Sequence, residues 1–300
     1  MTEKKRVGFI GVGYMGHGMA KNMLEKGHPL VIKGNRNRQP VDDLLARGAK
    51  ELATPKEIAA ASDIVFLCLP GSPQVEETVH GPDGLKAGAH DGLIIVDTTT
   101  ADPNATLALA AELAPLGVRF LDAPLGRTPK EAESGELDTM IGADPDTFAE
   151  IKPVVECWAK RIMHIGPVGS GHMMKLLMNF TALGYAALYS EALTIGAKTG
   201  ISKETFHSVI GGSRMDCGFY QTFMKYVVDG DVNAHLFSLR NAHKDLRYLN
   251  AVANNAGVAH YLATAVKNPY AHAEATGHGD DNVPQISDVI AAMSGVTLQG

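Results

Sequence analysis

Short apolar runs alternate with amphipathic stretches from residue 6 to about residue 165. The apolar runs are rich in Val and Ile, as strands buried on both faces require. Each is followed by a stretch with helical periodicity, and this order predicts a parallel sheet covered by helices. The predicted strands lie within 7–11, 30–34, 64–69, 93–99 and 119–124, and helical patterns lie within 19–27, 41–48 and 106–117.

Strand signals end at the Gly- and Pro-containing segment 166–171, which is the predicted domain boundary. We therefore expect a nucleotide-binding Rossmann-type domain over 1–166 and an all-helical domain for substrate binding and dimerisation over 167–300, joined by a long central helix. The helical patterns of the second part are 171–198, 203–212, 220–230, 239–257, 261–277 and 285–295.

The helix that begins near Gly171 is apolar on nearly every face as far as Tyr189, and Lys175 is the single cation near its start. Such a pattern predicts a helix that is buried on all sides. A second subunit covering the helix and a central helix buried within one chain both explain it.

Composition narrows the class of partner. Hydrophobic residues make up 45% and charged residues 20% of the chain, as in globular proteins, and the formal charge of −6 argues against nucleic acid. The three cysteines form no C-x-x-C pair, which favours a reducing cytoplasm. The first apolar run is broken by glycines, which favours a strand over a signal peptide, and no convincing membrane span follows. The twelve histidines lack ligand spacing, so we expect no metal.

A glycine motif follows the first predicted strand. Gly11, Gly13 and Gly16 have the G-x-G-x-x-G spacing, with Tyr14 and Met15 between the last two. The first glycine permits a tight turn, the second lets the backbone approach a pyrophosphate, and the third lets helix and strand pack closely. A strand before and a helix after the motif make a dinucleotide site the favoured interpretation, including contacts from Tyr14 and Met15.

The end of the second predicted strand indicates which dinucleotide binds. NAD sites usually carry Asp or Glu there, whereas this chain has Gly34, followed by Asn35, Arg36 and Arg38. Guanidinium groups suit a ribose phosphate, so NADP is favoured and NAD remains possible. The alternative is that these arginines only cover a solvated loop.

Four segments together resemble the β-hydroxyacid dehydrogenase family, which contains 3-hydroxyisobutyrate dehydrogenases and tartronate semialdehyde reductases. They are "GFIGVGYMGHGMA" (8–20), "DAPLGRT" (122–128), "GSGHMMKLLMNF" (169–180) and "HKDLRYL" (243–249). The resemblance covers essentially the whole chain. It implies that Lys175 is the catalytic acid/base and that Asn179 helps to hold the substrate.

The spacing of Lys175 and Asn179 agrees with those roles. Residues i and i+4 project from the same helical face, and the domain boundary just before them is expected to aim that face at the cofactor domain. Dry surroundings disfavour the ammonium form of a lysine and bring its proton within reach of neutral-pH chemistry. The alternative is a lysine whose amine extends to water at the start of the helix.

The segment "DAPLGRT" departs from the family pattern. Most members have Ser-Gly-Gly where this chain has Gly126, Arg127 and Thr128, and the Gly-Arg-Thr version is similar to sulfolactaldehyde reductases. Arg127 is expected to grip an anionic group of the substrate, with a surface arginine as the alternative. Met178 stands where that subgroup has a second asparagine, so the tail of the substrate, carboxylate or sulfonate, stays open.

The resemblance also implies further cofactor contacts. It places Leu69, Pro70 and Thr100 at the cofactor, with Thr100 near the nicotinamide, and Lys244 closing over the nicotinamide side beside Asp245. The alternative for Lys244 and Asp245 is a common pair on a helix surface.

Together these features predict an NADP-dependent dehydrogenase or reductase that acts on a small, anionic 3-hydroxy acid and its semialdehyde, as a homodimer or homotetramer. Two alternatives remain. An imine reductase has the same fold but usually lacks the lysine found here at 175. A nucleotide-sensing protein would bind the cofactor without catalysis.

Overall fold

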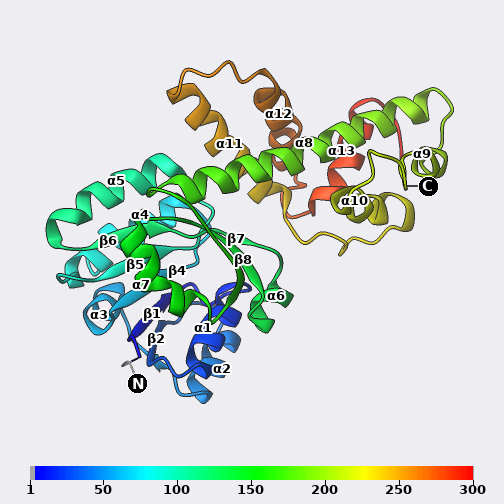
Figure 1. The fold of residues 1–300 in the computed structure, drawn as a ribbon. Coiled ribbons are helices and arrows are strands. Elements are labelled where there is room, and N and C mark those ends of the chain that lie inside the picture. The colour runs from blue at the N-terminus through cyan, green and yellow to red at the C-terminus, as the bar shows by residue number, and fades with distance from the viewer. Residues whose placement is uncertain (1–3, 300) are drawn as a thin grey trace. The chain divides into compact units, whose positions relative to one another are not determined.

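The computed structural model describes residues 4–299 and separates into two compact units, Met1–Lys175 and Leu176–Gly300 (Figure 1). Helix α8 (Ser170–Lys198) runs continuously through the division. The units therefore divide inside this helix, later in the chain than the segment 166–171. The fold class is confirmed: a parallel-sheet Rossmann-type unit precedes a helical one.

The first unit is built on a nine-stranded sheet in the order β3-β2-β1-β4-β5-β6-β8-β7, with β9 beside β8. The chain winds outward from β1 in one direction and then, from β4, in the other, so β1 and β4 flank the point where the strand order reverses. The strands are β1 (Val7–Ile10), β2 (Leu30–Lys33), β3 (Lys50–Glu51), β4 (Ile64–Leu67), β5 (Ile94–Asp97), β6 (Arg119–Asp122), β7 (Leu125–Gly126), β8 (Leu137–Gly142) and β9 (Ala159–Gly166).

The parallel strands end in register. Ile10 pairs with Leu67, Leu67 with Asp97, and Asp97 with Asp122. The loops that leave these strands therefore begin side by side at one edge of the sheet, where open α/β sheets bind ligands.

The sheet also contains antiparallel pairs, which the sequence pattern did not predict. β8 runs antiparallel to both β6 and β7, and β9 returns parallel to β8. These strands follow the last strand that hydrophobic pattern identified, and β7 has only two residues, too few for a period of two to be visible.

Helices cover both faces of the sheet (Figure 1). One apolar cluster joins Phe9 and Phe66 to α1, α2 and α7, and Trp158 packs edge-on to Phe66 with ring centroids 6.1 Å apart. A second cluster joins Val65 and Ile95 to α3, α4 and α5. The helices are α1 (Gly16–Glu25), α2 (Gln39–Ala46), α3 (Pro55–Ala61), α4 (Ser72–His80), α5 (Pro103–Leu113), α6 (Pro129–Ser134) and α7 (Pro145–Val155), with 3₁₀ turns at Leu85–Gly88 and Ala114–Leu116.

The second unit is helical, as the sequence predicts. It holds most of α8 together with α9 (Lys203–Ile210), α10 (Gly218–Asp229), α11 (Leu239–Asn255), α12 (Tyr261–Ala275), a 3₁₀ turn (Val283–Gln285) and α13 (Ile286–Met293). Its core gathers Tyr220, Phe223 and Tyr270 around the buried face of α8, where Leu183 and Leu193 lie. The buried Tyr270 hydroxyl donates to the Leu183 carbonyl at 2.9 Å, so the core leaves this polar group satisfied.

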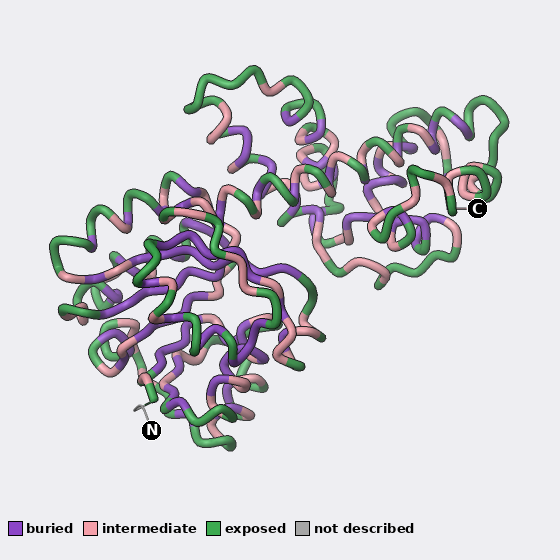
Figure 2. Tube along the Cα trace, viewed as in Figure 1, coloured by how far each residue is buried: buried purple, intermediate pink, exposed green. Residues whose placement is uncertain are grey.

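Helix α8 is not buried on all sides within the chain, so the alternative of a central helix buried within one chain is wrong (Figure 2). Leu188 and Ile195 are 61% and 57% exposed, and Tyr185 is also exposed. These residues share one helical face, because they follow one another at seven- and three-residue steps. Between residues 4 and 299 no helix is both long enough and apolar enough to span a membrane.

Candidate active site

The glycine loop between β1 and α1 has the geometry of a dinucleotide site. Gly11 has φ +100°, and a Cβ there would lie 2.1 Å from the Cys68 carbonyl oxygen. A Cβ on Gly16 would lie 2.0 Å from the Gly11 carbonyl oxygen, whereas a Cβ on Gly13 would meet nothing within 4 Å. The space beside Gly13 thus lets a phosphate reach the backbone at the start of a ten-residue helix. These residues fit a pyrophosphate.

The two residues between the glycines differ in exposure. Tyr14 is 91% exposed, and Met15, the residue before α1, packs partly against the core. Both directly follow Gly13 in the chain, and their contacts with the cofactor stay a prediction.

Hydrogen bonds tie the loops after β1, β4 and β5 together. The Cys68 amide donates to the Ile10 carbonyl at 2.9 Å, and the Leu69 amide donates to Thr99 Oγ1 at 3.1 Å. The Thr99 amide donates to Asp97 Oδ1 at 2.9 Å. The predicted contacts Leu69, Pro70 and Thr100 therefore lie on loops that the structure brings to the glycine loop.

The loop after β2 is more crowded than the sequence indicates. Arg38 forms a two-pronged pair with Glu51 of β3, with Nη1 and Nη2 at 2.7 and 2.8 Å from the two carboxylate oxygens. Its Nη2 also lies 3.2 Å from Asp42 Oδ1. The hydrogen bond from Arg38 holds the pKa of the Glu51 carboxyl below its ordinary value. Asn35 and Arg36 are exposed, and their side chains make no hydrogen bond to any described residue.

The loop between β7 and α6 holds Arg127 in an unusual conformation. Gly126 is buried on β7, and Arg127 has φ +75°, the one positive φ of a non-glycine residue between residues 4 and 299. Its Nε donates to Asp138 Oδ1 at 2.9 Å, while neither terminal nitrogen donates to a described residue. Thr128 begins α6 through a capping box with Glu131. Left-handed backbone at a long side chain is strained and is found disproportionately at functional sites.

A buried polar cluster, which the sequence did not reveal, fixes the start of α8. The Asp122 carboxylate accepts from the Gly169 and His172 amides at 2.6 and 2.7 Å. The fully buried His172 ring contacts Thr106 Oγ1 through Nδ1 at 2.7 Å, and its Nε2 lies 4.0 Å from Asp97 Oδ2. Burial raises the pKa of the Asp97 carboxyl, and the neighbouring imidazole acts against that rise.

One signal for this cluster was present in the sequence. Asp97 ends the apolar run Ile94–Val96, and Asp122 follows the buried Phe120 and Leu121, where a carboxylate is costly unless polar partners surround it. His172 stands between the glycine and the lysine of the α8 motif. No local rule pairs these residues, because their partners lie far apart in the chain.

Lys175 follows the cluster by one helical turn and is half-buried. Asn179 follows by one more turn, so both lie on the same face of one continuous helix. In the second unit the buried Asn179 amide donates to Asp245 Oδ2 at 2.7 Å. Lys244 Nζ lies 3.4 Å from Asp245 Oδ1 and 5.7 Å from the centroid of the Tyr248 ring. The structure thus brings Asn179, Lys244 and Asp245 together, which the sequence alone did not predict.

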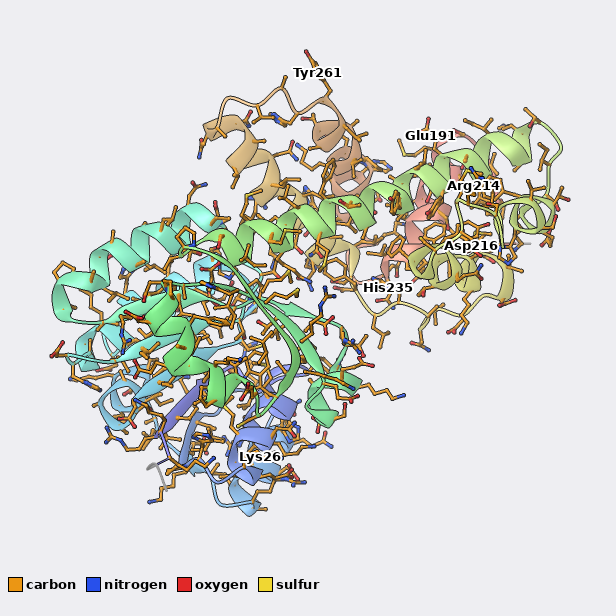
Figure 3. The ribbon with its side chains drawn as sticks, in the orientation of Figure 1. Lys26, Glu191, Arg214, Asp216, His235 and Tyr261 are labelled. Atoms are coloured by element: carbon orange, nitrogen blue, oxygen red, sulfur yellow. The ribbon has the colours of Figure 1, made fainter. Side chains whose placement is uncertain are left out.

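Two of the histidines contact aromatic rings or a carboxylate. His235, labelled in Figure 3, lies edge-on to the rings of Phe219 and Phe237, with centroid distances of 5.6 and 6.4 Å. His243 pairs with Glu274 at 2.7 Å. In the span 4–299, no three or more His, Cys, Asp or Glu side chains are grouped so as to hold a metal ion.

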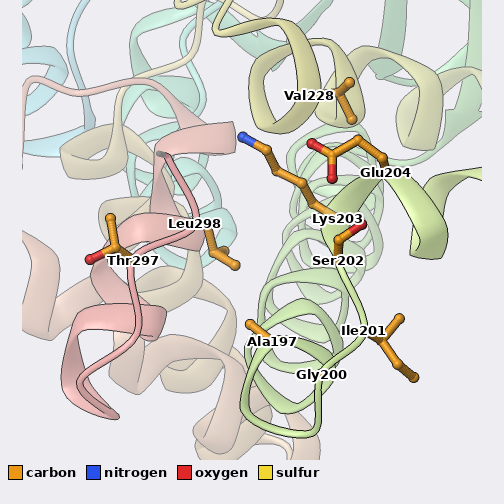
Figure 4. Close-up of a pocket in the computed structure, with 9 residues that line it drawn as sticks. All are labelled: Ala197, Gly200, Ile201, Ser202, Lys203, Glu204, Val228, Thr297 and Leu298. Carbon is orange, nitrogen blue, oxygen red and sulfur yellow. The ribbon is translucent and has the colours of Figure 1, made fainter.

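An open groove of about 620 Å³ lies at the far end of α8 from Lys175 (Figure 4). Ser202, Lys203 and Glu204 at the start of α9 line it, together with Thr297 and Leu298 near the end of the chain. None of the predicted site residues borders this groove. Its size therefore gives no reason to move the candidate site there.

Comparisons with known proteins agree with the geometry. Residues 6–166 match the family described as the NAD binding domain of 6-phosphogluconate dehydrogenase, and residues 169–290 match the family described as NAD-binding of NADP-dependent 3-hydroxyisobutyrate dehydrogenase. The chain is 32% identical to 2-(hydroxymethyl)glutarate dehydrogenase of Eubacterium barkeri, over 100% of this chain and 99% of that protein. It is 28% identical to 3-sulfolactaldehyde reductase of Escherichia coli K12, over 98% of each.

A solved structure shows the same fold over nearly the whole chain. The 3-hydroxyisobutyrate dehydrogenase of Mycobacterium tuberculosis superimposes with a TM-score of 0.84 at 25% identity, covering 97% of this chain and 99% of that one. The matched residues include both the glycine loop and the segment around Lys175. The chain therefore belongs to the β-hydroxyacid dehydrogenase family of NAD(P)-dependent oxidoreductases.

Proposed function

We propose that this protein is an NADP-preferring dehydrogenase that interconverts a small 3-hydroxy acid and its semialdehyde, with Lys175 as the general acid/base. The observation that carries the proposal is the anchored start of α8. Asp122 holds two amides of the segment 169–172, so Lys175, one turn later, projects from a fixed backbone. A fixed position is what proton transfer to a defined substrate atom requires.

Each residue of the site has a role in this reaction. The nicotinamide, when bound, supplies the hydride in reduction and accepts it in oxidation. Lys175 donates a proton to the carbonyl oxygen in reduction and removes it from the hydroxyl in oxidation. Asn179, held by Asp245, orients the substrate, and the terminal nitrogens of Arg127 take its anionic group, with Gly126 and Thr128 beside them.

The cofactor contacts follow the loops at the sheet edge. Gly11, Gly13 and Gly16 receive the pyrophosphate, with Tyr14 and Met15 next to it. The ribose phosphate of NADP is assigned to Asn35, Arg36 and Arg38. Leu69, Pro70 and Thr100 contact the cofactor from the neighbouring loops, and Lys244 closes the nicotinamide side. NAD is an accepted second cofactor.

A second copy of the chain completes the protein in this proposal. The exposed apolar face of α8, which includes Tyr185, Leu188 and Ile195, supports a homodimer or homotetramer. A cytoplasmic location agrees with three cysteines that remain free thiols. Size-exclusion chromatography with light scattering measures the subunit number, and a monomer at micromolar concentration would contradict the oligomer.

The test is a substrate panel. Succinic, malonic, tartronic, methylmalonic and sulfolactic semialdehydes are assayed with NADPH and NADH by the absorbance of the reduced nicotinamide. We expect turnover with at least one of them and a higher kcat/KM with NADPH. Consumption with cyclic imines alone would favour an imine reductase. Nucleotide binding without turnover of any carbonyl or imine would favour the nucleotide-sensing alternative.

A further inference from the structure

An acidic side chain from β3 lies at the loop after β2, and the sequence motif does not predict it. Glu51 lies on β3, beside Ile32 of β2 in the parallel register. A Cβ built on Gly34 would lie 2.0 Å from Glu51 Oε1 and 2.5 Å from Arg38 Nη1. The carboxylate of Glu51 therefore fills the space where the side chain of an acidic residue 34 would begin.

The position of this carboxylate bears on the choice between NAD and NADP. In dinucleotide-binding folds, the residue at the end of the second strand decides whether ribose hydroxyls or a ribose phosphate are accepted. A carboxylate accepts hydrogen bonds from the two hydroxyls of NAD and repels the phosphate of NADP. Here that carboxylate comes from the neighbouring strand, because residue 34 is a glycine.

The same carboxylate restrains Arg38. Both oxygens of Glu51 accept from Arg38, at 2.7 and 2.8 Å, and Asp42 accepts from it at 3.2 Å. Two-pronged pairs of this kind fix the plane of the guanidinium as well as its position. A phosphate can recruit Arg38 only in competition with two carboxylates, whereas Arg36 of the same loop is exposed.

We propose that Glu51 is a specificity-determining residue for the cofactor: it supplies the ribose-binding carboxylate that Gly34 lacks and competes with the phosphate of NADP for Arg38. The inference rests on the proposed nucleotide site. If Glu51 has this role, the wild-type protein should bind NADP only slightly more tightly than NAD, because the loop carries arginines for the phosphate and an acid for the hydroxyls.

The experiment measures binding, not turnover. Dissociation constants for NADPH and NADH are determined by isothermal titration calorimetry for the full chain and three variants: Glu51→Gln, Glu51→Asp and Asp42→Asn. For Glu51→Gln we expect NADPH to bind about tenfold more tightly and NADH about threefold more weakly, because a nearby negative charge is lost and one of the two acceptor oxygens is replaced by an amide donor.

The other two variants make the test specific. Glu51→Asp keeps the charge, so the ratio of the two constants should stay within about threefold of wild type. Asp42→Asn removes a carboxylate that also contacts Arg38 but lies on α2, away from Gly34, so its ratio should likewise stay within about threefold. Because Glu51 and Asp42 are both partly exposed, all three variants should remain folded.

The possible failures are distinguishable. A Glu51→Gln ratio within threefold of wild type, or one matched by Asp42→Asn, would overturn the role of Glu51 while leaving the nucleotide site in place. A wild-type protein that binds neither nucleotide would overturn the proposed function itself, and this inference with it.

Discussion

The loops after β1 and β2 stand side by side on the same sheet but are built differently. The first is formed by its backbone. There is no room for a Cβ at Gly11 or Gly16, and the absence of a side chain at Gly13 leaves open space beside the backbone. The second is built by side chains, and the partner of its Arg38 is Glu51, a residue from another strand. A backbone site is visible in a short motif, whereas a side-chain site depends on neighbours that the motif does not contain.

The start of α8 is also held by side chains from other elements, and we expect the largest loss of stability there. Asp122→Ala should lower the free energy of unfolding by about 4 kcal/mol, because two backbone amides lose a buried, charged acceptor. Urea unfolding followed by circular dichroism measures the loss. Asp144 is the matched control: it also accepts from two backbone amides, but it is exposed, so Asp144→Ala should cost about 1 kcal/mol. Equal losses would show that burial of the carboxylate is unimportant.

The two glycines of the first loop separate folding from binding. Gly16→Ala should destabilise the protein by about 3 kcal/mol, because its Cβ would lie 2.0 Å from a backbone oxygen. Gly13→Ala should leave the melting temperature unchanged, since the new Cβ meets nothing within 4 Å, yet weaken both nucleotides at least about tenfold. Thermal melts and calorimetric titrations check the pair. Unchanged nucleotide affinity in the Gly13 variant would contradict the assignment of the pyrophosphate to this loop.

Arg127 extends the comparison to the substrate. Arg127→Ala should raise KM for an anionic semialdehyde by the equivalent of about 2–3 kcal/mol, with a smaller change in kcat, because a charged hydrogen bond to the substrate is lost. Steady-state kinetics on carboxylate and sulfonate substrates measure it. Asp138→Asn is the control, because it removes the negative charge beside Arg127 Nε but keeps the guanidinium. A KM that Arg127→Ala leaves unaltered on both substrate types would refute the anion clamp.

The smallest effect concerns Arg36. Arg36→Ala should weaken NADPH by about tenfold, or 1.4 kcal/mol, and leave NADH within about twofold, because only the ribose phosphate meets this guanidinium. Calorimetric titration with each nucleotide measures both constants. Equal weakening of NADPH and NADH would assign Arg36 to the pyrophosphate or to the loop itself.

Sequence patterns predicted the parts of the fold that are long or strictly periodic. The helices of the second unit and the strands β1, β2, β4, β5 and β6 follow from apolar spacing, and the glycine loop follows from its motif. The two-residue β3 was not predicted. The antiparallel β8 and the two-residue β7 did not follow, because their pairing joins distant segments. The apolar face of α8 is exposed within the single chain, and hydrophobicity alone does not show which chain covers it.

The polar contacts of the site were harder to predict for the same reason. Lys175 and Asn179 were predicted from their family motif and their spacing on one helix. Their surroundings were not: Asp122 lies 47 residues before Gly169, and Asp245 lies 66 residues after Asn179. A buried carboxylate at a strand end indicates that it has hydrogen-bond partners, but only the fold shows which residues they are.

The most direct test of the account is Lys175→Ala, measured by stopped flow with the best semialdehyde of the panel and NADPH. We predict that NADPH still binds within about threefold of wild type, while the single-turnover rate of nicotinamide oxidation falls about 10³-fold, the range of general acid catalysis. A variant that binds NADPH and oxidises it at the wild-type rate would contradict the assignment of Lys175 as the proton donor.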